Sequence, residues 1–304
     1  MNRTGTWLGR AGAAAGWVSD RPPVWLYGTL AALPLLAWLP LVLSVTPPVR
    51  MSDLAFFGAA LMSSSLFPWN VVGLAVGATV VMLIAAALAA IGEAGLLEWI
   101  DDGEGHRPRG REIEVAFSVL TAASLPAIAV LAILASVTAA VAPTEFELPD
   151  TSGPLWLRLL GDLGPILALL TVVVVASQAV GASALRRAIG PHCQSISASL
   201  RDGLRDVARE PVRLLGLAIA STVADVLAFG LTLALLHVLW APIGPALAAG
   251  PSPRGLLLLV GFVAIWLATV MAVGVLRAWV ATWWSLELRR ELPEPRRETE
   301  EAHP

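Results

Sequence analysis

Six stretches of this sequence are almost entirely apolar, and each is long enough to cross a membrane as a helix. A hydrocarbon core of about 30 Å needs roughly 20 mostly apolar residues in a helix. Because no water satisfies the backbone there, such stretches predict an all-α bundle of six transmembrane helices. The stretches are Val24–Val45, Val71–Gly92, Val115–Val141, Leu157–Val180, Leu214–Leu239 and Leu256–Trp279.

The composition of the chain excludes several classes of protein. Of its 304 residues, 57% are hydrophobic and only 14% are charged, against about 25% charged in an ordinary soluble domain. A soluble enzyme, a disordered chain and a nucleic-acid binder do not fit these values, and we expect no nucleic-acid partner. The single cysteine, Cys193, excludes an internal disulfide framework and a cysteine-rich metal site. We expect no metal and no cofactor.

The distribution of basic residues predicts the orientation of the chain. All 20 are arginines, which indicates a GC-rich, bacterial genome. With six spans, the two terminal segments and the second and fourth connections lie on one side of the membrane, and sixteen arginines lie there. Only Arg50 and Arg254 lie in connections on the opposite side. Because basic residues concentrate on the cytoplasmic side, we expect both termini in the cytoplasm and the protein in the bacterial inner membrane.

These positions divide the chain into three parts. Residues 1–23 form a cytoplasmic N-terminal segment, and residues 24–285 form the six-helix membrane domain. Residues 286–304 are rich in Glu, Arg and Pro, a composition that cannot build a core and predicts a disordered cytoplasmic tail.

The cytoplasmic connection before the fifth stretch is amphipathic between Ser199 and Glu210. Four apolar residues recur at helical spacing, beside a row of three arginines. This pattern predicts a helix on the membrane surface with its arginines near anionic head groups. The alternative is a docking face for a cytosolic partner. The apolar residues are Ile196, Leu200, Leu204 and Val207, and the basic row is Arg201, Arg205 and Arg209.

Charged side chains at membrane depth are costly and are therefore candidates for function. Arg158 and Asp162 share one face of the fourth stretch, and Asp225 lies near the middle of the fifth. Their similar depths predict that the three meet, either as a proton- or cation-responsive site or as a structural ion pair. Glu93 and Arg277 lie near the inner ends of their stretches, where they could pair at the cytoplasmic face or simply reach the aqueous phase.

The sequence lacks three common signatures of catalysis. It contains no HExxH, no GxSxG and no P-loop. We therefore assign no catalytic residues and expect that the protein is not an enzyme. An enzyme that acts on lipid is the weakest of the functional alternatives.

Two segments carry a resemblance to a known group of proteins. They are "SLRDGLRDVAREPVRLLGLA" at 199–218 and "RAWVATWWSLELRR" at 277–290. They resemble poorly characterised six-span bacterial membrane proteins related to the membrane domain found ahead of glycerophosphodiester phosphodiesterases. The resemblance implies an amphipathic helix leading into a span and a last span with an aromatic, basic end. It implies no hydrolase activity, because the chain has no attached phosphodiesterase domain.

Two functions remain from these observations. The first is a membrane subunit or scaffold, embedded in the lipid bilayer and forming homo- or hetero-oligomers through its membrane helices. The second is a small permease or transporter subunit that uses the intramembrane Arg/Asp cluster. A polar cavity that reaches Asp225 would favour transport, whereas a dry, tightly packed bundle would favour a scaffold.

Overall fold

The computed structural model describes residues 6–36, 39, 60, 63–102, 108–147, 155–189, 195–248, 250 and 252–289. Throughout these ranges the regular secondary structure is helical. The helices are α1 (Trp7–Ser19), α2 (Pro22–Leu36), α5 (Trp69–Asp102), α6 (Gly110–Glu147), α7 (Leu155–Ile189), α8 (Ile196–Arg209), α9 (Pro211–Trp240), α10 (Ile243–Ala248) and α11 (Pro253–Arg289).

Five helices are long and apolar enough to span a membrane: α5, α6, α7, α9 (whose span continues to Ala246) and α11. Only 6% to 17% of the residues in their most apolar windows are buried inside the protein. Water would not tolerate so much exposed apolar surface, whereas lipid does. The first of the six predicted spans begins as α2, and its remainder lies outside the described residues except for Leu39.

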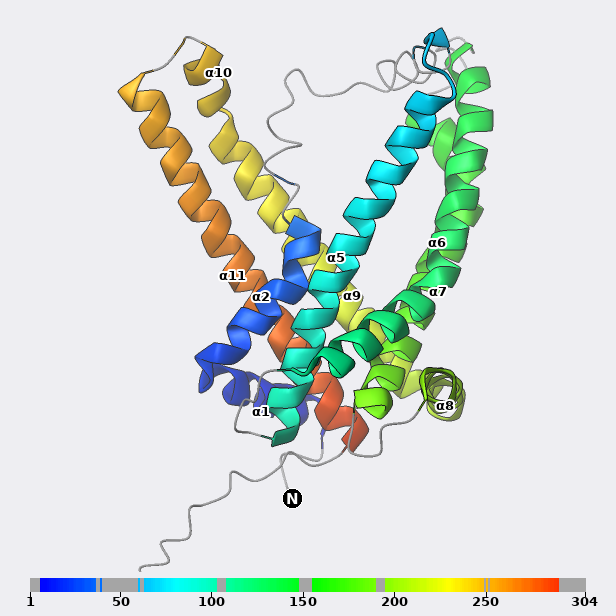
Figure 1. Cartoon of the computed structure of the whole chain (residues 1–304), viewed down its shortest axis with the longest axis vertical. Coiled ribbons are helices and arrows are strands. Elements are labelled where there is room, and N and C mark those ends of the chain that lie inside the picture. Colours follow the sequence, from blue (N-terminus) through cyan, green and yellow to red (C-terminus); the bar gives the residue numbers. More distant parts are fainter. Residues whose placement is uncertain are drawn as a thin grey trace, which may run out of the picture.

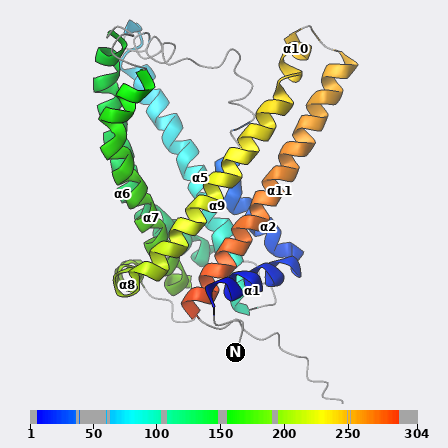
Figure 2. The ribbon, with the colours of Figure 1, turned by 180° about the vertical axis from the view of Figure 1, so that it is seen from behind.

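The long helices form two arms that diverge from a common vertex. Figures 1 and 2 show α5, α6 and α7 in one arm and α9, α10 and α11 in the other. We define the vertex as the end of the molecule where the C-terminal halves of α5, α7 and α11 meet the N-terminal halves of α6 and α9. Helix α2 packs against both α11 and α5 and so joins the two arms.

Close backbone contact holds α2 in this position. A Cβ atom added at Gly28 of α2 would lie 2.0 Å from the carbonyl oxygen of Gly274 in α11. One added at Gly92 of α5 would lie 2.5 Å from the backbone nitrogen of Ala31 in α2. Since real Cβ atoms do not approach so closely, glycine is required at both contacts, and side chains of ordinary size would separate the helices.

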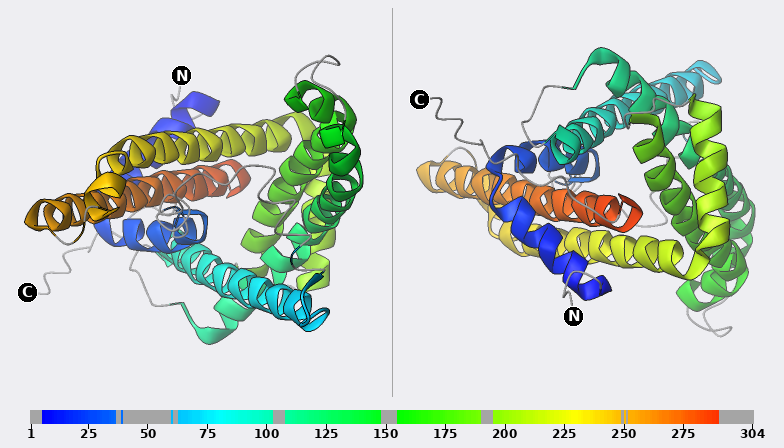
Figure 3. Two further views of the ribbon diagram at one scale, coloured as in Figure 1. Left: turned by 90° about the horizontal axis from the view of Figure 1, so that it is seen from above. Right: turned by 90° about the horizontal axis from the view of Figure 1, so that it is seen from below.

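Two shorter helices lie across the vertex (Figure 3). Helix α1 occupies most of the predicted N-terminal segment. It packs on α11, where the indole nitrogen of Trp279 donates to the carbonyl oxygen of Ala11 at 2.9 Å, and the rings of Trp7 and Trp283 lie 4.6 Å apart. Helix α8 begins at Ile196, after Ser195 caps its N-terminus, and it packs against α7.

The end of α11 corrects the predicted boundary of the C-terminal tail. The helix continues to Arg289, so residues 286–289 belong to it, and residues 290–304 lie outside the described residues. The physical reason is Glu287, whose carboxylate is fully buried between Arg10 of α1 and Arg213 of α9. These ion pairs fix the last turn of the helix against the vertex.

Candidate functional site

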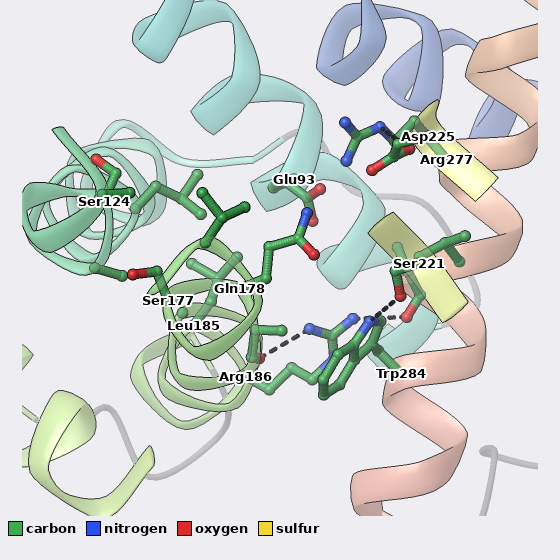
Figure 4. Close-up of a pocket in the computed structure, with 18 residues that line it drawn as sticks. Glu93, Ser124, Ser177, Gln178, Leu185, Arg186, Ser221, Asp225, Arg277 and Trp284 are labelled. Carbon is green, nitrogen blue, oxygen red and sulfur yellow. Dashed lines mark hydrogen bonds and ion pairs between the residues drawn. The ribbon is translucent and has the colours of Figure 1, made fainter. Parts of the chain in front are cut away.

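A cavity of about 280 Å³ lies at the vertex, where five helices come together. Figure 4 shows its polar side chains converging from the surrounding helices. The helices α5, α6, α7, α9 and α11 all contribute. The polar residues that line the cavity are Glu93, Ser124, Ser177, Gln178, Arg186, Ser221, Asp225, Arg277 and Trp284.

One side of the cavity carries an ion pair between α9 and α11. The Nε atom of Arg277 lies 3.1 Å from Oδ1 of Asp225. Asp225 is only 8% exposed, so its charge is removed from solvent and its pairing partner matters. The two helices pack against each other, which brings together two side chains that lie on different predicted spans.

The opposite side carries Glu93 of α5 and Gln178 of α7. The Thr222 hydroxyl of α9 lies 2.7 Å from the amide oxygen of Gln178, which leaves the amide nitrogen of Gln178 available to the cavity. Among the residues that the structure describes, Glu93 makes no ion pair and no side-chain hydrogen bond. Figure 4 shows Glu93 and Gln178 extending towards the middle of the cavity, with Arg277 facing them.

The floor of the cavity contains a second arginine in a fixed position. Arg186 of α7 donates to the carbonyl oxygens of Ala182 at 2.9 Å and Ala281 at 2.6 Å, and to the hydroxyl of Ser285 at 2.9 Å. Its guanidinium also lies 6.0 Å from the ring centre of Trp284. These contacts join α7 to α11 and immobilise a positive charge beneath the cavity.

Of the three charges expected to cluster, the structure brings only Asp225 to this cavity. Arg158 and Asp162 lie on the same helix as Gln178, but sixteen or more residues towards its N-terminus. At 1.5 Å per residue they are therefore about 24 Å or more from it along the helix axis. Asp162 is exposed. The expected meeting assumed that the fourth and fifth spans run side by side, whereas α7 and α9 diverge.

Pairing between Glu93 and Arg277 was one of two predicted alternatives, the other being contact with the aqueous phase. Both residues line the cavity, so they do face a common space. Arg277, however, pairs with Asp225, and in the described part of the chain no ion pair joins it to Glu93. The two side chains lie on opposite sides of the cavity (Figure 4), which leaves room between them.

Sequence reasoning did not predict the other six polar residues of this site, which are Ser124, Ser177, Gln178, Arg186, Ser221 and Trp284. The charge pattern places Arg186 among the arginines of a cytoplasmic connection, although α7 continues to Ile189 and includes it. Gln178 and the serines carry no charge, so a search for charged side chains does not find them. The useful signal was present, since an amide side chain within a long apolar stretch is itself costly to bury.

The basic row of the amphipathic helix lies outside the cavity. The side chains of Arg201 and Arg205 are 65% and 60% exposed, and Arg209 is also exposed. The neighbouring apolar stripe is divided between two environments. Ile196 and Leu200 pack with a buried cluster of α5, α6 and α7, whereas Leu204 is 59% exposed.

The fold defines a helical membrane protein with a charged cavity among its long helices. Comparison with protein-family models, with curated proteins and with solved structures finds no match for this chain. The resemblance of two segments to a six-span group therefore stays a prediction, and any function has to be argued from the cavity.

Proposed function

We propose that this chain is a multi-pass protein of the bacterial inner membrane that binds a small polar or charged group in the vertex cavity. In this proposal it acts as the membrane component of a transport system. In this proposal the first predicted span begins as α2 and is the sixth span, and an even number of spans leaves both termini in the cytoplasm. The single observation that carries the proposal is the charged cavity at the junction of five helices.

The distribution of arginines supports this orientation. Helix α8 and the N-terminal helix α1 both lie at the vertex end (Figure 1), and these two helices carry several of the predicted cytoplasmic arginines, including Arg10, Arg201, Arg205 and Arg209. The vertex then faces the cytoplasm, and the arms diverge towards the outside. The exposed arginines of α8 lie near the anionic head groups of the inner leaflet.

The energetics of buried charge favour a binding role over a purely structural one. Removing two ions from water costs several kcal/mol each, and a well-packed apolar contact often serves stability as well. A bundle that only had to be stable would gain little from Asp225, Arg277 and Glu93 around an open space. A polar ligand that passes through the bilayer needs such groups, because they replace its hydration.

Cysteine accessibility tests whether water and polar solutes reach the cavity. In a background in which Cys193 is changed to Ser, Ser124→Cys and Ser177→Cys each place one thiol at the cavity wall. A membrane-impermeant, charged thiol reagent is applied to vesicles of both orientations. We expect both variants to be labelled from at least one side, because a hydrated thiol can ionise and react.

The matched control is Ala129→Cys. Ala129 is exposed and follows Ser124 by five residues, so it lies about 140° around the same helix and faces away from the cavity. In lipid its thiol stays protonated, and we expect labelling at least tenfold slower than at Ser124→Cys. Equal, slow labelling at all three positions from both sides would contradict a transport role.

A second candidate function, a subunit or scaffold, is favoured by one separate observation. Most of the N-terminal half of α5 is exposed, and added Cβ atoms at Gly73 and Gly77 would meet no atom of the described residues within 4 Å. A GxxxG spacing allows close approach of another helix in a membrane. This segment would then contact a second copy of the chain or another membrane subunit.

A further inference from the structure

We infer that the cavity binds the head group of a zwitterionic amphiphile, with its amine end at Glu93 and its phosphate end at Arg277. The alkyl chains of this ligand lie between the diverging arms. The inference rests on the proposed function and names the class of ligand that the same cavity takes. Three independent features of the cavity lead to it.

The first feature is the arrangement of charge that is open to a ligand. The Glu93 carboxylate has no partner among the described residues. The guanidinium of Arg277 contacts Asp225 through Nε, and within the described ranges its two terminal nitrogens make no hydrogen bond. An acceptor and a set of donors therefore face each other across one space (Figure 4). A ligand with one cationic and one anionic end complements both.

The second feature is the apolar surface that continues the cavity-lining faces of α5, α6 and α7 away from the vertex. On α6 the face of Ser124 and Ala127 continues to Leu131, which is 53% exposed. On α7 the face of Val174 continues seven residues away to Leu167, which is 37% exposed.

On helix α5, too, the cavity-lining face continues into exposed apolar surface. Its cavity residue Glu93 shares a helix face with Met82, eleven residues earlier, and Met82 is 54% exposed. The polar cavity is thus followed by apolar walls on three helices of one arm, and the arms diverge in this direction (Figures 1 and 2). An alkyl chain fits such walls, whereas a fully polar solute leaves them unsolvated.

The third feature is size. A cavity of about 280 Å³ is small compared with a membrane lipid. It can take a head group of the size of phosphoethanolamine but not a whole phospholipid. If the ligand has alkyl chains, they must therefore leave the cavity, and the apolar walls mark where they go.

Native mass spectrometry of the delipidated, full-length protein tests this inference. Dioleoyl phosphatidylethanolamine, dioleoyl phosphatidylglycerol and water-soluble phosphoethanolamine are titrated separately. Phosphatidylglycerol has the same chains and phosphate but no amine. We expect phosphatidylethanolamine to bind at least tenfold more tightly than phosphatidylglycerol, because only its ammonium can pair with Glu93. Phosphoethanolamine should bind at least tenfold more weakly than phosphatidylethanolamine, because it has no chains to bury.

Variants locate the binding at the cavity. Glu93→Gln keeps the shape of the side chain and removes its charge, and we expect it to abolish the preference for phosphatidylethanolamine. Asp162→Asn also removes one carboxylate, but from an exposed position of α7 outside the cavity, and it should keep the preference. The comparison of the two lipids on the unmodified protein decides the question even if Glu93→Gln fails to fold.

Each outcome has a defined consequence. Equal affinity for the two lipids, or a preference that Glu93→Gln retains, overturns the inference. If phosphoethanolamine binds as tightly as the lipid, the alkyl chains do not contribute to binding. The ligand is then a water-soluble molecule with the same head group, and the inference of an amphiphile is overturned. Cavity cysteines that are labelled while no lipid preference is seen leave the proposed transport role intact. Cavity cysteines that are not labelled remove that role itself.

Discussion

At the scale of single residues, Glu287 shows how one buried charge holds three helices together. Its side chain is fully buried, with Oε1 lying 2.6 Å from Nε of Arg10 and Oε2 lying 2.9 Å from Nε of Arg213. Arg213 also donates to the backbone carbonyl of Glu287. The arginines come from α1 and α9, whereas Glu287 ends α11. A single carboxylate therefore fixes the N-terminal helix and two long helices at the vertex.

Removing this charge should destabilise the protein. In Glu287→Gln two largely buried guanidinium groups lose their common partner, and we expect a loss of about 3 kcal/mol in the free energy of unfolding. Thermal unfolding of the detergent-purified protein measures it. The control is Glu210→Gln, since Glu210 contacts Arg213 at an exposed position and should contribute less than about 1 kcal/mol. Equal melting temperatures for the two variants would show that Glu287 is not a structural anchor.

The residues of the cavity show what single-sequence reasoning can supply at this scale. The cost of charge in lipid drew attention to Asp225, Glu93 and Arg277, and all three line the cavity. The position of a residue in the sequence, however, predicts only its depth in the membrane and not its position in the membrane plane. The rotation of each helix and the divergence of the arms decide which side chains meet, and these depend on contacts such as that between Gly28 and Gly274. Asp225 therefore pairs with Arg277 of α11 and lies far from Asp162.

At the scale of elements, α8 was predictable as a helix but not in its packing. The repeat of apolar residues predicted a helix, and it forms from Ile196 to Arg209. The side of α8 that lies closest to α7 contains Ser199 and Gly203, which are both buried. A Cβ atom at Gly203 would lie 2.9 Å from the carbonyl oxygen of Val180. Small residues set this contact because they allow close approach, and a pattern based on hydrophobicity does not register them.

A polar contact supports the same interface and can be tested. Asp206 of α8 accepts from Arg187 at 2.8 Å through each carboxylate oxygen and from the Ser183 hydroxyl at 2.9 Å. We expect Asp206→Asn to weaken the docking of α8 by about 1 kcal/mol, since the arginine is partly exposed. Hydrogen exchange of the α8 amides should then be faster. Asp202→Asn, which changes a contact within α8 only, should leave the exchange unchanged, and equal exchange in both variants would argue against this role for Asp206.

At the scale of the whole molecule, the two arms depend on α2 for their relative position. Helix α2 contacts α11 and α5 through glycines, whereas α7 and α9 separate above the vertex. The arms lie progressively further apart with distance from the vertex (Figures 1 and 2). The sequence predicted the number and order of most spans from their length and hydropathy, but it contained no comparable signal for the divergence of the arms.

The contact between α2 and α11 therefore offers a test of how the arms and the cavity are coupled. A Cβ atom at Gly274 would lie 2.6 Å from the backbone nitrogen of Thr29, so Gly274→Ala must move α11 away from α2. Such overpacking costs about 1–3 kcal/mol. Because Arg277 lies one turn further along α11, we also expect at least a threefold change in the labelling rate of Ser124→Cys.

Gly261→Ala changes the same helix where no atom of the described residues lies within 4 Å, and there both the melting temperature and the labelling rate should stay within error of the parent. A loss of stability in Gly274→Ala without any change in labelling would mean that α2 supports the fold but does not set the geometry of the cavity.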